Sequence, residues 1–96
     1  MDKKEVIYTP HLQLRLKIRE IDDNLPREIY EESKERYFDS YTGYYVAISE
    51  VYYKDKFREM AVIYEETANE IKIVTIHPLK RYEKFSKIRN GRWKKR

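Results

Sequence analysis

Histidine and arginine side chains are the residues of this chain best suited to chemistry on a phosphodiester. RNA can be cleaved without a metal ion when its 2′-hydroxyl attacks the adjacent phosphate, which requires a proton acceptor, a proton donor and cations for the developing charge. Histidine accepts or donates a proton near neutral pH, and arginine binds phosphate oxygens through two parallel contacts. The candidate catalytic residues are His11, Arg15, Arg58, His77 and Arg92.

Each candidate also has a purely structural interpretation. His77 directly precedes Pro78, so it fits a turn residue whose ring bonds to backbone groups. His11 fits a solvated position in the first turn of a helix, and Arg15 fits a surface ion pair with a glutamate of the following helix. Exposed ion pairs of that kind contribute little to stability.

The chain lacks the residues that other kinds of catalytic or binding site require. The chain has no cysteine, two histidines and two glycines, and no group of carboxylates lies near either histidine at ligand spacing. Zinc sites, nucleophilic serine or cysteine sites and glycine-rich phosphate loops depend on such residues. We therefore expect no metal and no cofactor.

Positive charge is concentrated at the C-terminal end. Residues 78–96 contain nine Lys or Arg and one acid, whereas the other 77 residues contain twelve bases and sixteen acids. Such a segment attracts polyanions because each neutralised phosphate releases counterions, and the rings of Tyr82, Phe85 and Trp93 suit stacking on bases. The predicted nucleic-acid-binding residues are Arg19, Lys80, Arg81, Lys84, Arg89, Trp93, Lys94, Lys95 and Arg96. The alternatives are a solvated terminal helix with a loose tail and a Trp93 indole that packs on the sheet.

Length and composition predict one cytoplasmic domain over residues 1–96. No apolar run approaches the ~20 residues that span a bilayer, and no signal-peptide core lies near Met1. Charged residues make up 40% of the chain, and amide side chains are sparse. High Lys and Glu content with few amides is typical of heat-adapted proteins.

Local patterns predict three helices. Thr9-Pro10 is a capping signal for a helix, although Leu12 to Ile18 also alternates as a strand would. Read as a helix, this segment places Leu14, Ile18, Ile21 and Leu25 on one face. A second helix is predicted from Leu25 to about Lys34, and a third after Pro78 that stops at Asn90-Gly91.

The middle of the chain predicts four strands. They are expected at 37–40, 44–53, 57–65 and 71–76, separated by short turn signals that favour antiparallel hairpins. The predicted fold is α+β: two N-terminal helices packed on a four-stranded antiparallel sheet, with a short C-terminal helix and a basic tail.

Two blocks of sequence resemble a known type of small domain. The C-terminal block runs from Ile76-His77-Pro78 to Arg92-Trp93, and the N-terminal block is Thr9-Pro10-His11 with Arg15 and Arg19 after it. Together they resemble an uncharacterised prokaryotic family similar to BrnT and RelE toxins, in the barnase–EndoU–colicin–RelE group of ribonucleases. The resemblance implies helices on a four-stranded antiparallel sheet and a cleft in which messenger RNA is cut without a metal.

The sequence therefore supports two functional hypotheses. The first is a toxin-like, metal-independent endoribonuclease, and the alternative is a nucleic-acid-binding or protein-interaction module without catalysis. The expected partners are RNA, free or on the ribosome, an antitoxin-like protein, and a second copy of the chain; no membrane is expected.

Overall fold

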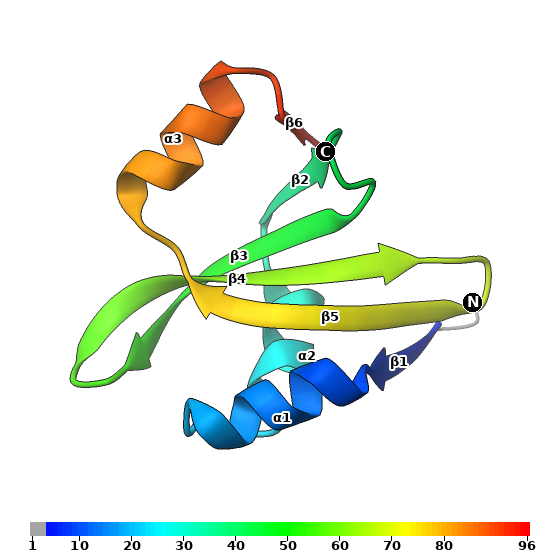
Figure 1. The fold of residues 1–96 in the computed structure, drawn as a ribbon, viewed down its shortest axis with the longest axis vertical. Helices are drawn as coiled ribbons and strands as arrows, with labels where there is room; N and C mark the ends of the chain where they lie inside the picture. Colours follow the sequence, from blue (N-terminus) through cyan, green and yellow to red (C-terminus); the bar gives the residue numbers. More distant parts are fainter. Residues whose placement is uncertain (1–3) are drawn as a thin grey trace.

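The computed structural model describes residues 4–96 as an α+β fold built on one mixed sheet (Figure 1). Within these residues the sheet has six strands in the order β1-β5-β4-β3-β2-β6. The elements are β1 (Glu5–Tyr8), α1 (Pro10–Ile18), α2 (Leu25–Glu32), β2 (Glu35–Asp39), β3 (Tyr45–Tyr53), β4 (Lys56–Glu66), β5 (Glu70–Pro78), α3 (Arg81–Arg89) and β6 (Trp93–Lys95).

The predicted four-stranded antiparallel sheet is wrong. Two further strands lie at the edges of the sheet: β1 pairs with β5 in parallel, and β6 pairs with β2 in antiparallel. Because β1 precedes α1, the two predicted helices are not the first elements of the fold. Both added strands are only three or four residues long, and each pairs with a strand distant in sequence, so no hairpin turn marks it.

Helix α1 forms where the capping signal predicts it. The Thr9 hydroxyl accepts a hydrogen bond from the Leu12 amide at 3.1 Å and donates one to the Val74 carbonyl at 3.2 Å. The helix is therefore confirmed over the strand alternative. The predicted apolar face is wrong for Leu14 and Ile18, whereas Ile21, beyond the end of the helix, is buried. Leu12 and Leu16 are buried, whereas Leu14 and Ile18 are exposed. Both pairs have i,i+4 spacing, and only the attachment of Thr9 to β5 decides which one faces the sheet.

The two faces of the sheet carry separate apolar clusters. On one face, α1 and α2 cover a cluster that includes Leu12, Ile29, Val62 and Ile73. The other face, which we call the α3 face, is formed by Tyr37, Val46, Ile48, Ala61, Leu79 and Trp93. Figure 1 shows α1 and α2 on one side of β3, β4 and β5, with α3 on the other side.

Burial of both faces matches the apolar pattern of the central strands. In β4 the consecutive residues Met60, Ala61 and Val62 are all buried, as expected for a strand covered on both sides. No helix among residues 4–96 is long and apolar enough to cross a membrane. The expectation about a signal peptide near Met1 concerns residues that lie partly outside the described range.

Candidate nucleic-acid interface

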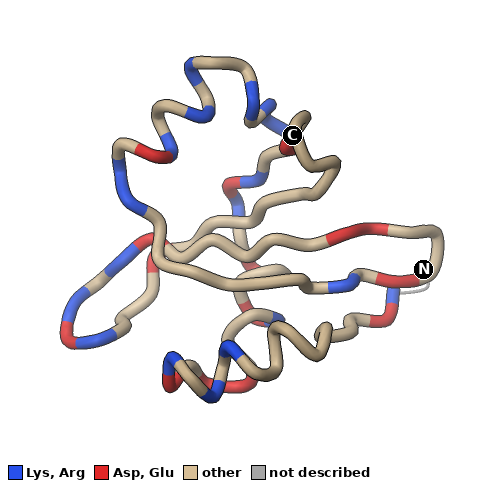
Figure 2. Tube along the Cα trace, in the orientation of Figure 1, with Lys and Arg blue, Asp and Glu red and all other residues tan. Residues whose placement is uncertain are grey.

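The basic C-terminal segment is attached to the sheet at both of its ends. Two residues separate the end of β5 from the start of α3, and β6 pairs with β2 through Asp39↔Trp93, Phe38↔Lys94 and Tyr37↔Lys95. Figure 2 shows Lys and Arg distributed along α3 and into β6, on the side of the sheet opposite α1 and α2. The predicted basic tail is therefore wrong over residues 93–95, which form an edge strand, and α3 stands beside the sheet rather than projecting from it.

Trp93 anchors this segment. Its side chain is 3% exposed and stacks on Tyr37, with 5.5 Å between ring centroids. The Lys87 ammonium lies 4.9 Å from the centre of the Trp93 ring. Of the two alternatives left open by the sequence, the buried position matches packing on the sheet, and the indole is not exposed to a base.

Arg92 holds the start of β6 through a buried carboxylate. Its Nε and Nη2 atoms donate hydrogen bonds to the two carboxylate oxygens of Asp39, at 3.0 and 3.1 Å. The backbone amides of Tyr41 and Thr42 also donate to Asp39. Burial raises the pKa of Asp39, but these hydrogen bonds outweigh it and the pKa is lowered overall. The predicted catalytic residue Arg92 therefore also closes the β2–β3 turn onto β6.

Lys84 joins α3 to the middle of the sheet. Its ammonium lies 2.8 Å from a carboxylate oxygen of Glu35 on β2 and 2.9 Å from one of Glu59 on β4. The Tyr37 hydroxyl donates a further hydrogen bond to Glu35 at 2.6 Å. Burial lowers the pKa of Lys84, but its two carboxylate partners outweigh burial and raise it. The Lys84 ammonium is therefore protonated, and the carboxylates of Glu35 and Glu59 balance its charge. Its main effect is to fix α3 to the sheet.

A groove lies between α3 and the hairpin formed by β3 and β4. Its volume is about 910 Å³, and we call it the hairpin–α3 groove. Five cationic side chains line it: Lys56, Arg58, Lys80, Arg81 and Lys84. The other side chains that matter for its chemistry are the rings of Phe57 and Phe85 and the carboxylates of Glu50 and Glu59.

Four of the five groove cations are available to a ligand. Within residues 4–96, Lys84 is the groove cation that forms ion pairs with carboxylates; Lys56, Arg58, Lys80 and Arg81 form none. The Lys80 and Arg81 side chains extend from the first residues of α3, where the helix dipole adds positive potential. The groove thus combines unneutralised positive charge with exposed rings.

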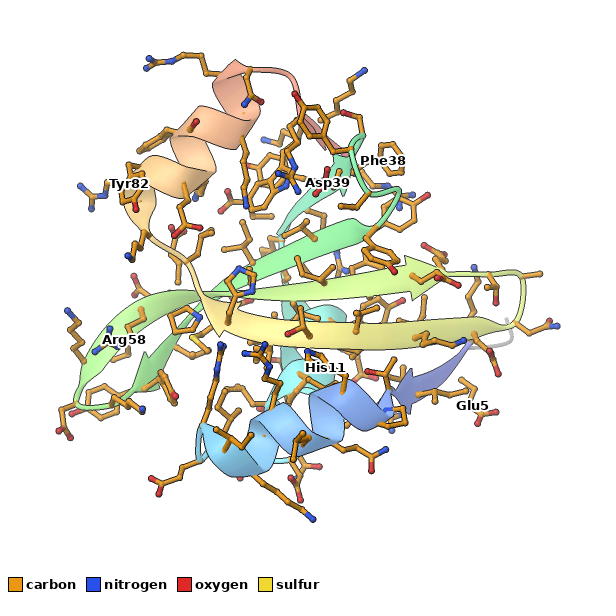
Figure 3. All side chains as sticks on the ribbon, viewed as in Figure 1. Glu5, His11, Phe38, Asp39, Arg58 and Tyr82 are labelled. Atoms are coloured by element: carbon orange, nitrogen blue, oxygen red, sulfur yellow. The ribbon has the colours of Figure 1, made fainter. Side chains whose placement is uncertain are left out.

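Arg58 is positioned by the turn of the hairpin. Its Nε donates a hydrogen bond to the Tyr53 carbonyl at 2.9 Å. The turn residues Lys54 and Asp55 have φ angles of 50° and 67°, which is the backbone of a two-residue turn matched to the twist of the strands. Among residues 4–96, the guanidinium donates to backbone carbonyls and to no carboxylate, so its charge is not neutralised by them at the groove. Figure 3 shows Arg58 on this hairpin, away from His11 on α1.

A second group of predicted residues lies at the edge of β5. Strand β1 covers β5 as far as Ile73, and beyond that point the capping residues of α1, Thr9 and Arg19, donate hydrogen bonds to β5 carbonyls. Arg19 Nη1 donates to the Ile76 carbonyl at 3.1 Å. Burial lowers the pKa of the adjacent His77, and the nearby charges of Lys87, Arg19 and Arg15 lower it further, while Glu83 opposes them. His77 is therefore neutral near pH 7.

The five predicted catalytic residues lie in three places. His77 shares the β5 edge with Arg15, and His11 precedes Arg15 by one turn on α1. Arg58 borders the hairpin–α3 groove, and Arg92 is paired with Asp39 beside β6. The structure does not bring the five together into one pocket.

The predicted binding residues are also divided. Lys80, Arg81 and Lys84 line the groove, and Arg89 lies further along α3. Lys94 and Lys95 are exposed on β6, whereas Arg96 lies 3.7 Å from Glu66 and over the Tyr45 ring. The catalytic and binding roles themselves remain predictions.

Sequence reasoning missed two groove residues, Lys56 and Phe57. Their sequence signal is weak: a lysine in a hairpin turn and a phenylalanine beside Arg58. Their relevance comes from α3, which follows β5 and lies beside the hairpin, so the tertiary arrangement was needed to find them.

Comparisons with known proteins do not extend these observations. No protein-family model, no curated protein and no solved structure matches the chain. The resemblance to BrnT and RelE toxins therefore remains an expectation from the two sequence blocks, and the function must be argued from the geometry.

Proposed function

We propose that this chain binds nucleic acid, with RNA as the first ligand to test, through the hairpin–α3 groove. The observation that carries the proposal is a set of four cations around one hollow, next to two exposed phenyl rings; no carboxylate in the described part of the chain pairs with any of the four. Phosphate groups would contact Lys56, Arg58, Lys80 and Arg81, and release of condensed counterions would supply most of the affinity.

The charge pattern of the rest of the molecule supports one preferred orientation. The first 77 residues carry more acids than bases, so a polyanion is repelled from most of the surface and attracted to the basic segment. The Lys84 and Arg92 ion pairs keep that segment in place beside the sheet. A fixed cationic groove binds with less loss of chain entropy than a loose tail would.

RNA cleavage is the second candidate function, and one observation favours it. His77 is neutral near pH 7 and lies among the charges of Arg15, Arg19 and Lys87, so it could accept a proton beside cations that stabilise a phosphate. Cleavage would be metal-independent and cytoplasmic, and an antitoxin-like protein would control it. Binding is preferred because Arg58 and Arg92 do not share this location.

Fluorescence anisotropy with a labelled RNA tests the binding proposal. An RNA of about 20 nucleotides is titrated at several salt concentrations between about 50 and 300 mM. The wild-type chain is compared with a Lys80→Ala/Arg81→Ala variant and with a Lys17→Ala/Lys34→Ala control, which loses the same charge away from the groove. We expect the groove variant to bind at least about tenfold more weakly and to lower the salt slope by about 1.4, with little change in the control.

Two results would refute the binding proposal. One is an affinity that does not depend on salt, and the other is equal weakening by the groove variant and the control. The same samples, incubated in EDTA and run on a gel, test cleavage: product that disappears in His77→Gln favours the second candidate, and intact RNA argues against it.

A further inference from the structure

A second hollow continues the hairpin–α3 groove along the outside of α3. It has a volume of about 340 Å³ and is lined by Tyr82, Phe85, Ser86, Arg89 and Asn90. Phe85 also lines the first groove, so the two hollows meet at its ring. The result is a continuous surface from the β3–β4 hairpin to the C-terminal end of α3.

Three aromatic rings on this surface are largely exposed. Phe57 is 68% exposed, Tyr82 is 68% exposed and Phe85 is 54% exposed. Tyr82 and Phe85 are three residues apart, so they lie on adjacent turns of one side of α3. Figure 3 shows the Tyr82 side chain directed away from the sheet. Phe57 packs edge-on against Tyr52, with 5.3 Å between ring centroids, and the Lys80 ammonium lies 6.0 Å from the centre of the Tyr82 ring. Phe85 pairs with no other ring among residues 4–96, and an exposed ring of this kind can stack on the face of an unpaired base.

Charge alternates with these rings along the surface. Arg81 and Lys80 lie at the start of α3, and Arg89 lies at its end, about two helical turns further on. Among residues 4–96, no carboxylate forms an ion pair with any of these three cations. Rings that stack on bases, with cations on either side for the phosphates, are the arrangement used by proteins that bind single strands.

We propose that the ligand is a single-stranded nucleic acid that runs along the outer side of α3, with one base stacked on Phe85 between the two hollows. This inference rests on the proposed binding function and specifies its substrate class. A duplex keeps both faces of its bases covered by stacking, so it can contact the cations but not the rings. The preference for single strands therefore depends on Phe85, while general affinity depends on the cations.

Binding of single-stranded and duplex RNA by matched variants tests this inference. The probes are a labelled single strand of about 12 nucleotides and the same strand annealed to its complement. The variants are Phe85→Ala, the groove variant Lys80→Ala/Arg81→Ala, and a control, Leu14→Ala, which removes an exposed apolar side chain on α1. Circular dichroism confirms that each variant is folded.

We expect the wild-type chain to bind the single strand about tenfold more tightly than the duplex. Phe85→Ala should lose most of that preference and leave both the duplex affinity and the salt slope unchanged, because no phosphate contact is removed. The groove variant should weaken both ligands and lower the slope, and Leu14→Ala should change neither.

The outcomes separate the two proposals. Equal affinity for both ligands, or an unaffected Phe85→Ala variant, overturns the single-strand inference while salt-dependent binding through Lys80 and Arg81 still stands. Loss of salt-dependent binding to every RNA overturns the proposed function as well. Binding to phosphatidylserine vesicles that depends on Phe85, without binding to the single strand, assigns the rings to a lipid surface and also overturns the inference.

Discussion

Replacement of Lys84 by methionine removes one positive charge that two carboxylates share. The Lys84 ammonium lies 2.8 Å from Glu35 and 2.9 Å from Glu59, and methionine keeps most of the apolar stem while it removes the ammonium. The two carboxylates are then left near each other without a cation. We expect the variant to fold but to be clearly less stable than the wild type.

The burial of the three groups sets the magnitude. Loss of one partner of a fully buried ion pair costs about 3–5 kcal/mol, and exposed pairs contribute up to about 1 kcal/mol. The Lys84 side chain is 15% exposed, while those of Glu35 and Glu59 are 32% and 33% exposed, so water can partly solvate the carboxylates after the change. We therefore expect a loss of about 2 kcal/mol in the free energy of unfolding, or a fall in Tm of about 8–16 °C.

Urea unfolding at pH 7 measures this loss against a matched control. Lys80→Met removes a lysine four residues earlier, at the start of the same helix, that forms no ion pair with the described carboxylates. Burial raises the pKa of Glu35, but the hydrogen bonds from Lys84 and Tyr37 outweigh it, so the folded-state pKa lies below the usual value. The stability from Glu35 is therefore present above its unfolded pKa and is lost as the pH falls through the folded pKa.

The difference between wild type and Lys84→Met should consequently narrow as the pH falls from about 5 to about 3. A Lys84→Met variant whose unfolding free energy lies within about 0.5 kcal/mol of that of Lys80→Met would refute the reasoning. It would mean that the ion pairs of Lys84 contribute little to the attachment of α3.

Three further predictions concern other titratable groups. Arg92→Ala should lower the free energy of unfolding by about 2–3 kcal/mol because it leaves the buried Asp39 carboxylate without its cation. A variant that unfolds at the same urea concentration as the wild type would contradict this prediction. Because the pKa of His77 is lowered in the folded chain, protonation of His77 opposes folding, and the stability of the wild type should decline as the pH falls below about 6.5. The His77→Gln variant should show a smaller decline. Parallel plots of stability against pH for the two proteins would contradict this prediction. Burial and the nearby Glu35 raise the pKa of Tyr37 to about 12, so Tyr37→Phe should remove one late-ionising phenol from an ultraviolet titration, and a change near pH 10 instead would show that the phenol is solvated.

Elements with local signals were predictable from the sequence. Thr9-Pro10 marks the start of α1 because cap and first turn are adjacent in the chain, and the hairpin turn at Lys54-Asp55 lies between two apolar segments. Capping and tight turns depend on contacts between near neighbours, so their residues can be recognised without the fold. The strands β3, β4 and β5 were located within a few residues for the same reason.

The edges of the sheet were not predictable. Strand β1 pairs with β5 across a separation of about 65 residues, and β6 contributes one buried residue, Trp93, with two exposed lysines. Neither strand has a local partner or a turn to reveal it, so long-range pairing decided both. The rotation of α1 was decided in the same way, by the hydrogen bond from Thr9 to the β5 edge.

The amino-acid sequence by itself determined the excess of positive charge at the C-terminal end, its interleaved rings and the candidate residues, because composition and order need no tertiary contact. The tertiary structure alone decided which charges remain free. It pairs Lys84 with two glutamates and Arg92 with Asp39, and it places Lys80, Arg81 and Phe85 opposite Arg58 across the groove. Neutralisation and grouping depend on distances of a few ångströms between residues far apart in the chain, and only the folded sheet brings them to those distances.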